Sequence, residues 1–343
     1  MKIKIPTPIS GGLILSYKCN ASCRHCMYAC CPQWPAHWIN DSDLQKILSQ
    51  LARTIQPSPF GPEAVTLSHG LYFTGGEPFL NFELLLQATQ IAREFNIPST
   101  FVETNAFWCI NDTVTREKLQ ALKDAGIKGI MISVNPFYLE YVPFERTRRC
   151  VEISLEIFGH NTMIYQLEFF RRFHALNIKG KFTLDEYIQR EGNSNILRHA
   201  EFFMMGRAPY RLSRHLSPYF RRHSPEFFFR QPCVPEFLRE WHNHFDNYGN
   251  YMPGFCGGLT LGDCRKLDTL LSEGIELDHF PILAYIVADD FAGLFHYATE
   301  RGYHPPVEGY LSKCHLCVDI RKFLVETGEY AELQPREFYR YLH

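Results

Sequence analysis

Hydrophobic and polar positions follow two patterns from the N-terminus to about residue 205. Short apolar runs at 11–17, 70–76, 99–104 and 128–134 are typical of buried strands. Between them, apolar residues recur every three or four positions over 41–55, 81–95, 115–126 and 145–158, which predicts amphipathic helices. Asn40, Asn81 and Gly126 are suited to cap the ends of three of these helices. The segment 163–169 fits a strand or a helix, and 179–184 fits a further strand.

Alternating strands and helices of this length predict a parallel sheet built from βαβ units. Five or six units are too few for a closed eight-stranded barrel, so we expect an incomplete (β/α)6 barrel of the TIM type. Functional residues should then lie at the carboxyl ends of the strands. The pattern ends near Gly206, which predicts two domains, a core over 1–205 and a smaller C-terminal domain over 206–343.

The composition of the 343 residues is that of an ordinary globular protein, with 45% hydrophobic residues and a formal net charge of −2. This rules out a wholly disordered chain and gives no electrostatic reason to expect nucleic acid or an anionic membrane as a partner. No apolar run is long enough to span a membrane, and Pro and Gly interrupt the N-terminal segment where a signal peptide would be apolar. We therefore expect a cytoplasmic protein.

Twelve cysteines stand out against this composition: Cys19, Cys23, Cys26, Cys30, Cys31, Cys109, Cys150, Cys233, Cys256, Cys264, Cys314 and Cys317. In a reducing compartment, clustered thiols favour metal binding or catalysis over disulfides. Cys19, Cys23 and Cys26 directly follow the first predicted strand. Three thiolates at this spacing can hold a 4Fe-4S cluster and leave one iron open for a ligand. The alternative is a zinc knuckle with His25, Cys30 or Cys31 as the fourth ligand.

A second set of cysteines lies in the C-terminal part of the chain. Cys233 and Cys256 flank a predicted hairpin whose turn is Asp-Asn-Tyr-Gly-Asn, and Cys314 and Cys317 follow at a spacing of three. Four thiolates make a closed site without an open position, which suits a second 4Fe-4S cluster or a structural zinc ion. Cys264 would replace Cys233 if the hairpin is misread.

The first cysteine set and a second motif together resemble the radical S-adenosylmethionine (SAM) superfamily. The spacing Cys-x3-Cys-x2-Cys follows the first strand, and Gly75-Gly76-Glu77-Pro78 ends the second, matching the GGEP motif of that family. The resemblance covers about residues 10–205. It implies that SAM binds the open iron and that the residues of the GGEP motif contact its methionyl amino group.

Further cofactor contacts are implied by the same resemblance. His25 has the place of a residue near the adenine, and the ends of the next two strands supply contacts to the ribose or carboxylate. These candidates are Glu103, Thr104, Asn105, Ser133 and Asn135. The alternative for all of them is a polar loop at the mouth of the barrel.

The C-terminal cysteines resemble the twitch or SPASM extensions of radical SAM enzymes, which hold auxiliary 4Fe-4S clusters. Six residues separate Gly249 from Cys256 where the family pattern has four. The cysteines are too few for two fully ligated clusters, so the resemblance implies one auxiliary cluster.

The implied activity is reductive cleavage of SAM to a 5′-deoxyadenosyl radical that abstracts a hydrogen atom from a substrate. Ferredoxin or flavodoxin would be the electron donor. We favour oxidation of a small molecule, because the auxiliary cluster can accept an electron and no peptide-binding segment precedes the first strand. Alternatives are an epimerase with Cys109 as hydrogen-atom donor, a peptide-modifying maturase of the same superfamily, and a non-catalytic zinc-binding α/β protein. Cys150 lies in a predicted helix and suits the core.

Three weaker signals complete the picture. A run of arginines predicts either a pocket for an anionic substrate or a solvated segment: Arg207, Arg211, Arg214, Arg221, Arg222 and Arg230. His242 and His244 alternate on a predicted strand and are expected to be exposed. Tyr138, Tyr141 and Phe144 follow a strand end and could form a wall of the substrate cavity.

Overall fold

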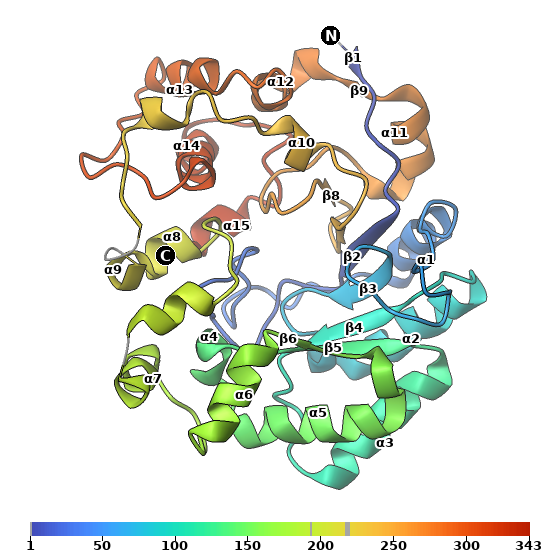
Figure 1. Ribbon diagram of the computed structural model, residues 1–343. Helices are drawn as coiled ribbons and strands as arrows, with labels where there is room; N and C mark the ends of the chain where they lie inside the picture. The colour runs from blue at the N-terminus through green and yellow to red at the C-terminus, as the bar shows by residue number, and fades with distance from the viewer. Residues whose placement is uncertain (1, 193, 217–219) are drawn as a thin grey trace.

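The strands of the chain form one large open sheet in the computed structural model, which describes residues 2–192, 194–216 and 220–343 (Figure 1). Its seven strands lie in the order β6-β5-β4-β3-β2-β7-β8. All neighbours are parallel except β7 and β8, which form an antiparallel hairpin. The bounds are β2 Ser10–Ile14, β3 Gly70–Thr74, β4 Phe101–Thr104, β5 Gly129–Ser133, β6 Thr162–Tyr165, β7 Asn243–Asp246 and β8 Tyr251–Met252.

Four amphipathic helices confirm the sequence pattern: α1 Asp41–Leu51, α2 Phe82–Glu94, α3 Asp112–Ala125 and α5 Phe144–Phe158. Neighbouring helices α2, α3 and α5 pack against one another beside the sheet. The predicted caps are present: the side chains of Asn40 and Asn81 accept backbone N–H groups of α1 and α2, and Gly126 ends α3 at a φ of +121°.

Two segments differ from, or refine, the prediction. The ambiguous stretch 163–169 contains both elements, because β6 is followed at once by α6 (Leu167–Ala175). The strand expected over 179–184 is wrong, since helix α7 (Leu184–Glu191) begins there. Thr183 and Glu186 form a capping box at its start, and this local pair favours a helix over the strand suggested by the apolar residues.

The predicted fold class is confirmed. The sheet has no strand at 179–184, and β7 joins it beside β2. The sheet is an incomplete barrel: β6 and β8 are its edges within the described residues. Strand β7 pairs in parallel with β2, with Gly11 opposite Asn243. A Cβ atom at Gly11 would meet the Asn243 carbonyl oxygen at 2.5 Å, so only glycine permits this approach. The sheet therefore continues past residue 206.

The remaining elements are mostly short helices, and those of the last eighty residues gather on one side of the sheet (Figure 1). They are α4 Pro136–Leu139, α8 Ala208–Arg211, α9 Ser213–Leu216, α10 Val234–Phe237, α11 Leu267–Glu273, α12 Pro281–Val287, α13 Phe291–Thr299, α14 Lys313–Thr327 and α15 Glu337–Arg340. Strands β1 (Lys2–Ile3) and β9 (Ile275–Glu276) form a separate antiparallel pair. No helix of the described residues is long and apolar enough to cross a membrane.

The concave side of the sheet carries a small cluster of its own. Tyr72, Phe101 and Met131 are buried there, with Met163 and Tyr165 partly buried against them, separate from the main core. These side chains from β3, β4, β5 and β6 form a floor of the barrel interior. The space beyond this floor, toward the carboxyl ends of the strands, remains open as the cavity described below.

Candidate functional site

The three cysteines of the first motif lie in a buried loop that follows β2. Cys19 and Cys23 are 7% and 5% exposed, and the backbone N–H of Cys26 donates to the carbonyl of Cys23. Burial, and then the charges of Cys19 and Cys26, raise the pKa of the Cys23 thiol well above its ordinary value. The three sulfurs therefore lie close enough to repel as thiolates, and an iron centre is the kind of cation that would stabilise them.

Cys30 is a fourth thiol in the same loop. A hydrogen bond from Cys30 lowers the pKa of Cys26 to about 6. Cys30 is 3% exposed, and Cys31 is equally buried. The loop thus holds both extra thiols that could serve as a fourth zinc ligand. The third candidate for that ligand, His25, has its Nε2 atom 3.2 Å from Nδ2 of Asn135.

The guanidinium of Arg207 holds this loop from the side of the C-terminal segment. Its Nη1 atom donates to the carbonyls of Cys23 and Cys30, at 3.0 and 3.2 Å. Its Nη2 atom donates to Ala29 and Cys30, and Nε donates to the carbonyl of Tyr341. Arg207 is 1% exposed, and all three of its nitrogens donate to carbonyl oxygens. It is therefore a framework residue and not part of an anion pocket.

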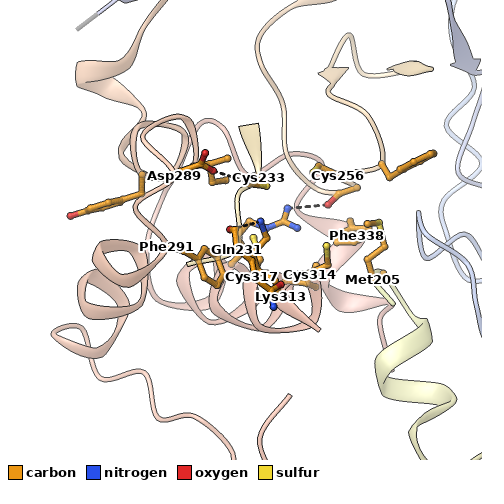
Figure 2. A pocket seen from close by; sticks show the side chains of 17 residues that line it. Met205, Gln231, Cys233, Cys256, Asp289, Phe291, Lys313, Cys314, Cys317 and Phe338 are labelled. Atoms are coloured by element: carbon orange, nitrogen blue, oxygen red, sulfur yellow. Dashed lines mark hydrogen bonds between the residues drawn. The ribbon is translucent and has the colours of Figure 1, made fainter. Parts of the chain in front are cut away.

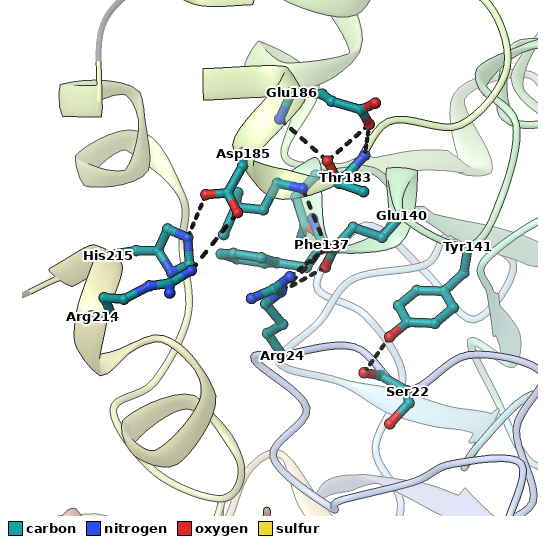
Figure 3. Close-up of polar contacts among 12 residues, drawn as sticks. Ser22, Arg24, Phe137, Glu140, Tyr141, Thr183, Asp185, Glu186, Arg214 and His215 are labelled. Atoms are coloured by element: carbon teal, nitrogen blue, oxygen red, sulfur yellow. Dashed lines mark hydrogen bonds and ion pairs between the residues drawn. The ribbon is translucent and has the colours of Figure 1, made fainter. Parts of the chain in front are cut away.

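Two contacts hold the loop from the other side (Figure 3). Arg24 lies between the second and third cysteines of the motif, and its Nε and Nη2 atoms donate to both carboxylate oxygens of Glu140. Glu140 also accepts the backbone N–H of Leu184 at the start of α7. The hydroxyl of Tyr141 donates to the carbonyl of Ser22 at 2.8 Å. The loop is thus tied to the segments that follow β5.

The glycines of the second motif allow the end of β3 to pack directly on the cysteine loop. Gly76 donates its N–H to the carbonyl of Ser16, and Glu77 donates to that of Lys18. A Cβ atom at Gly76 would lie 2.0 Å from the Lys18 carbonyl oxygen, and Gly75 has a φ of +140°. Any other residue at either position would displace the loop that carries the cysteines.

The carboxylate of Glu77 is used inside the chain. It accepts the hydroxyl of Thr104 and the backbone N–H of Asn105, both at 2.8 Å, and the backbone N–H of Phe79 at 3.3 Å. Burial raises its pKa to about 7. Glu77, Thr104 and Asn105 therefore link the ends of β3 and β4, and Pro78 begins a short 3-10 helix behind them.

The remaining cofactor candidates lie at or near one central cavity of about 300 Å³. His25, Gly75, Glu103 and Ser133 line it. Asn135 stands behind it: its side-chain oxygen caps α4, and its Nδ2 atom lies 3.2 Å from Nε2 of His25. The lining comes from five strands and the loops beyond them: His25, Cys26, Met27, Tyr28, Leu67, Tyr72, Thr74, Gly75, Glu103, Met131, Ser133, Tyr138, Tyr165, Glu201, Phe202, Phe203, Trp241, His242, His244 and Phe255.

A buried histidine with two tyrosines forms one wall of this cavity. The Nε2 atom of His244 lies 2.8 Å from the Tyr72 hydroxyl, and Nδ1 lies 2.7 Å from the Tyr28 hydroxyl and 3.0 Å from the Gly254 carbonyl. Burial lowers the pKa of His244 well below its ordinary value, so the ring is neutral. A proton on Nδ1 would be donated to the Gly254 carbonyl and leave Nε2 to accept from Tyr72, whereas in the other tautomer Nδ1 accepts from the Tyr28 hydroxyl.

The expectation of exposed histidines on this strand is wrong. His244 is 2% exposed, and His242 lines the same cavity. Glu103 also faces the cavity and accepts the Thr74 hydroxyl, and burial raises its pKa to about 7. The pairing of β7 with β2 creates this wall, and periodicity within one segment carries no signal for such a long-range pairing.

The second cysteine set meets in one cavity in the C-terminal part (Figure 2). Cys233, Cys256, Cys314 and Cys317 all line it. Cys314 and Cys317 lie in the first turn and a half of α14, which Ser312 caps. Burial, followed by the charges of Cys317 and Cys233, raises the pKa of Cys314 to about 12. The hairpin prediction is confirmed, and these four thiols are the set expected from the sequence.

Cys264 lies apart from this cavity. It is 1% exposed, and its charged neighbours are Asp246, Asp263 and Arg265. Among the described residues, no three His, Cys, Asp or Glu side chains converge at the spacing of a single metal ion. The four thiols surround a cavity of their own, and this donor set suits an iron–sulfur cluster as well as zinc.

One residue belongs to both cavities. Phe255 lines the central cavity and the cavity of the second cysteine set, directly before Cys256 in the chain. Its ring lies 5.1 Å from that of His242 and 4.0 Å from that of Phe203. The two cavities therefore share a wall one residue thick at this point.

Of the remaining candidates, only Tyr138 lies in the lining of the central cavity. Cys109 is fully buried and not in the lining of the central cavity, and it interacts with Cys150. Tyr138 lines the cavity as expected, but Tyr141 contacts the loop and Phe144 packs on Phe170 and Phe173.

The arginine run does not form one pocket. Arg211, Arg214, Arg221 and Arg230 are exposed, and Arg222 donates to the carbonyl of Gly309. Arg214 and His215 contact Asp185 of α7 (Figure 3). Of the two predictions for these arginines, a solvated segment therefore describes them better than a pocket for an anionic substrate. Arg207 is the exception, because it is buried.

Comparison with known proteins gives distant likenesses, and no family model matches the chain. The putative peptide biosynthesis protein YydG of Bacillus subtilis (strain 168) is 22% identical over 142 residues. That match spans 41% of this chain and 40% of the relative, which is well under half of the length of each.

Two solved structures are similar over most of their length. BtrN in complex with AdoMet and 2-DOIA has a TM-score of 0.45 at 11% identity, covering 84% of this chain and 89% of that one. Native anSMEcpe with bound AdoMet and Kp18Cys peptide has a TM-score of 0.41 at 13% identity, covering 76% of this chain and 78% of that one. The descriptions of both structures name AdoMet. The proposals below rest on the motifs and on the geometry of the chain itself.

Replacing Arg207 should disorganise the cysteine loop. We expect Arg207→Met to lower the free energy of unfolding by about 3 kcal/mol or more, because several buried carbonyls lose a charged donor. Urea unfolding of the full chain measures this, together with iron uptake after anaerobic reconstitution. The matched control is Arg211→Met, because Arg211 lies four residues after Arg207 and its side chain is exposed. Equal stability of the two variants would contradict the framework role of Arg207.

Proposed function

We propose that this chain is a radical SAM enzyme in which Cys19, Cys23 and Cys26 hold the SAM-binding 4Fe-4S cluster. The observation that carries the proposal is that residues from the two separate motifs, Cys26 and Gly75, open into the same cavity. His25, Glu103 and Ser133 also line it and are proposed to contact SAM, with Asn135 orienting His25. In this proposal Gly76 contributes its backbone, while Glu77, Pro78, Thr104 and Asn105 support the site from behind.

When bound, the cluster and SAM supply a 5′-deoxyadenosyl radical that abstracts a hydrogen atom from the substrate. The chain's own residues orient the reactants and exclude water. Tyr72, Phe101 and Met131 close the floor of the barrel, and the loop that carries the cysteines contributes His25, Cys26, Met27 and Tyr28 to the lining of the cavity. A low-potential donor, ferredoxin or flavodoxin, is proposed to supply the electron.

We further propose that Cys233, Cys256, Cys314 and Cys317 hold one auxiliary 4Fe-4S cluster in a C-terminal domain over 206–343. The support is that the four thiols line one cavity and that the reserve candidate, Cys264, lies outside it. When bound, such a cluster can accept an electron. The shared wall at Phe255 lies directly between the central cavity and this site.

Oxidation of the substrate fits this arrangement better than epimerisation. In an oxidation the substrate would lose a hydrogen atom from carbon, then a proton and one electron, and a cluster held by the four thiols would supply the acceptor for that electron. An epimerase instead needs a thiol that returns a hydrogen atom in the cavity. Within the described lining, Cys26 is the one thiol, and it is a proposed cluster ligand. Cys109, the donor expected from the sequence, is buried elsewhere.

A peptide-modifying maturase is the second candidate for the substrate class, beside the small molecule favoured by the sequence. Leu67, Phe203 and Trp241 line the cavity and are 37%, 39% and 42% exposed, so an apolar rim surrounds its mouth. Such a rim suits side chains of a longer substrate that stays partly outside. The likeness to a putative peptide biosynthesis protein favours the same class.

The first cluster is tested by changing Cys19, Cys23 and Cys26 together to Ala. We expect reductive cleavage of SAM to stop while about four irons remain bound, the content of one remaining cubane. The readouts are 5′-deoxyadenosine formed with dithionite and iron and sulfide per chain. Cys31→Ala is the control, since it removes a thiol of the same loop outside the motif. Continued 5′-deoxyadenosine formation by the triple variant would refute the assignment.

The auxiliary site is tested by changing Cys314 and Cys317 together to Ala. Iron content should fall by about one cubane, and the C-terminal part should become less stable, because the cluster links distant segments of the chain. Cys264→Ala should leave the iron content unchanged. If only zinc disappears from the double variant, the second site is a zinc site.

The reaction class is tested by turnover in deuterated water once a substrate is found among peptides and small molecules. Oxidation predicts a product lighter by two hydrogens, and a product without deuterium at the reacting carbon. Mass spectrometry measures both. A product that carries stoichiometric deuterium at that carbon and has lost no hydrogens relative to the substrate would instead establish epimerisation.

A further inference from the structure

Helix α14 brings an arginine to the second cysteine cavity. Arg321 lies one turn after Cys317, lines the same cavity and is 2% exposed. Its Nη1 atom donates to the carbonyl of Gly257 at 3.0 Å and to the hydroxyl of Tyr339 at 3.1 Å. The guanidinium is therefore fixed against the loop that contains Cys256.

Among the residues that the structure describes, no carboxylate pairs with the positive charge of Arg321. None of the ion pairs found among the described residues involves it, and its Nε atom is buried without a hydrogen-bond acceptor. Arg207, the buried arginine at the first cysteine set, differs in this respect because Nε, Nη1 and Nη2 all donate to carbonyls. A buried charge without a partner is strongly unfavourable, so an anionic group is needed beside Arg321.

The thiols are the groups that can supply this negative charge. Burial acts to lower the pKa of the Arg321 guanidinium, but Tyr339, Cys317 and Cys256 together raise it above its ordinary value. The other nearby cation, Lys313, donates from its Nζ atom to the carbonyls of Gln231 and Pro232 at the exposed edge of the cavity. Solvent screens a charge there more strongly than at Arg321.

We propose that Arg321 is a positioning residue that sets the reduction potential of the auxiliary centre. The inference rests on the proposed function, in which these four thiolates hold a 4Fe-4S cluster. One-electron reduction adds one negative charge to that centre. A fixed cation in a poorly solvated cavity stabilises the more negative state, so it makes the site a better acceptor for the electron that leaves the substrate. The lining also contains Lys313 and Asp289, and the Asp289 carboxylate accepts the backbone N–H groups of Cys233 and Val234.

The experiment uses the full chain with Cys19, Cys23 and Cys26 changed to Ala, so that one cluster remains. Midpoint potentials are measured by a redox titration followed by electron paramagnetic resonance. We expect Arg321→Gln to keep about four irons and to disfavour reduction about tenfold or more, which is a shift of about 59 mV to lower potential. Arg321→Lys keeps the charge and should stay near the parent. Lys322→Gln removes the neighbouring cation, which does not line the cavity, and should have no effect.

The outcomes separate this inference from the function on which it depends. A parent that contains zinc and no iron refutes the auxiliary cluster. A parent with iron and an Arg321→Gln variant of unchanged potential refutes the role of Arg321 and leaves the cluster standing. If Arg321→Gln loses its cluster, the potential of Arg321→Lys becomes the test. A retained cluster at the parent potential supports the proposal that the positive charge at position 321 sets the reduction potential. A retained cluster at a lower potential contradicts that proposal.

Discussion

The guanidinium of Arg207 joins three parts of the chain that lie far apart in the sequence. It binds carbonyls of Cys23, Ala29 and Cys30 in the cysteine loop and the carbonyl of Tyr341 near the end of the described chain. A loop that must turn its thiols inward cannot form a helix or a sheet ladder, so its buried carbonyls need another donor. One buried arginine satisfies them and at the same time fixes the position of the segment that follows Gly206.

Close backbone contacts extend this arrangement to the second cysteine set. A Cβ atom at Gly206 would lie 2.4 Å from the carbonyl oxygen of Met27, and one at Gly257 would lie 2.8 Å from the same atom. The residue after Cys26 is therefore packed between two glycines, one from the start of the C-terminal part and one directly after Cys256. The two cysteine sets are held at a fixed separation by backbone, which is less compliant than side-chain packing.

Local signals explain what the sequence could predict. The helices have caps and periodic apolar faces, the two motifs lie at strand ends, and the hairpin has its turn residues, so each can be identified from a few neighbouring residues. The pairing of β7 with β2 depends on Gly11 meeting Asn243, two residues that no local pattern connects. For this reason the sequence pattern predicts His244 on the surface and groups the buried Arg207 with arginines that are mostly exposed.

The same long-range pairing couples the wall of the central cavity to the second cysteine loop. The neutral ring of His244 carries one N–H, and its Nδ1 atom lies near both the Gly254 carbonyl, two residues before Cys256, and the Tyr28 hydroxyl. In the tautomer that donates to Gly254, the other nitrogen accepts from Tyr72, which stands on the floor of the barrel. In that tautomer, a displaced Cys256 loop would take away the acceptor of the Nδ1 proton and so change the orientation of the Tyr72 hydroxyl. One imidazole and one backbone carbonyl thus connect the wall of the central cavity to the loop of the second cysteine set.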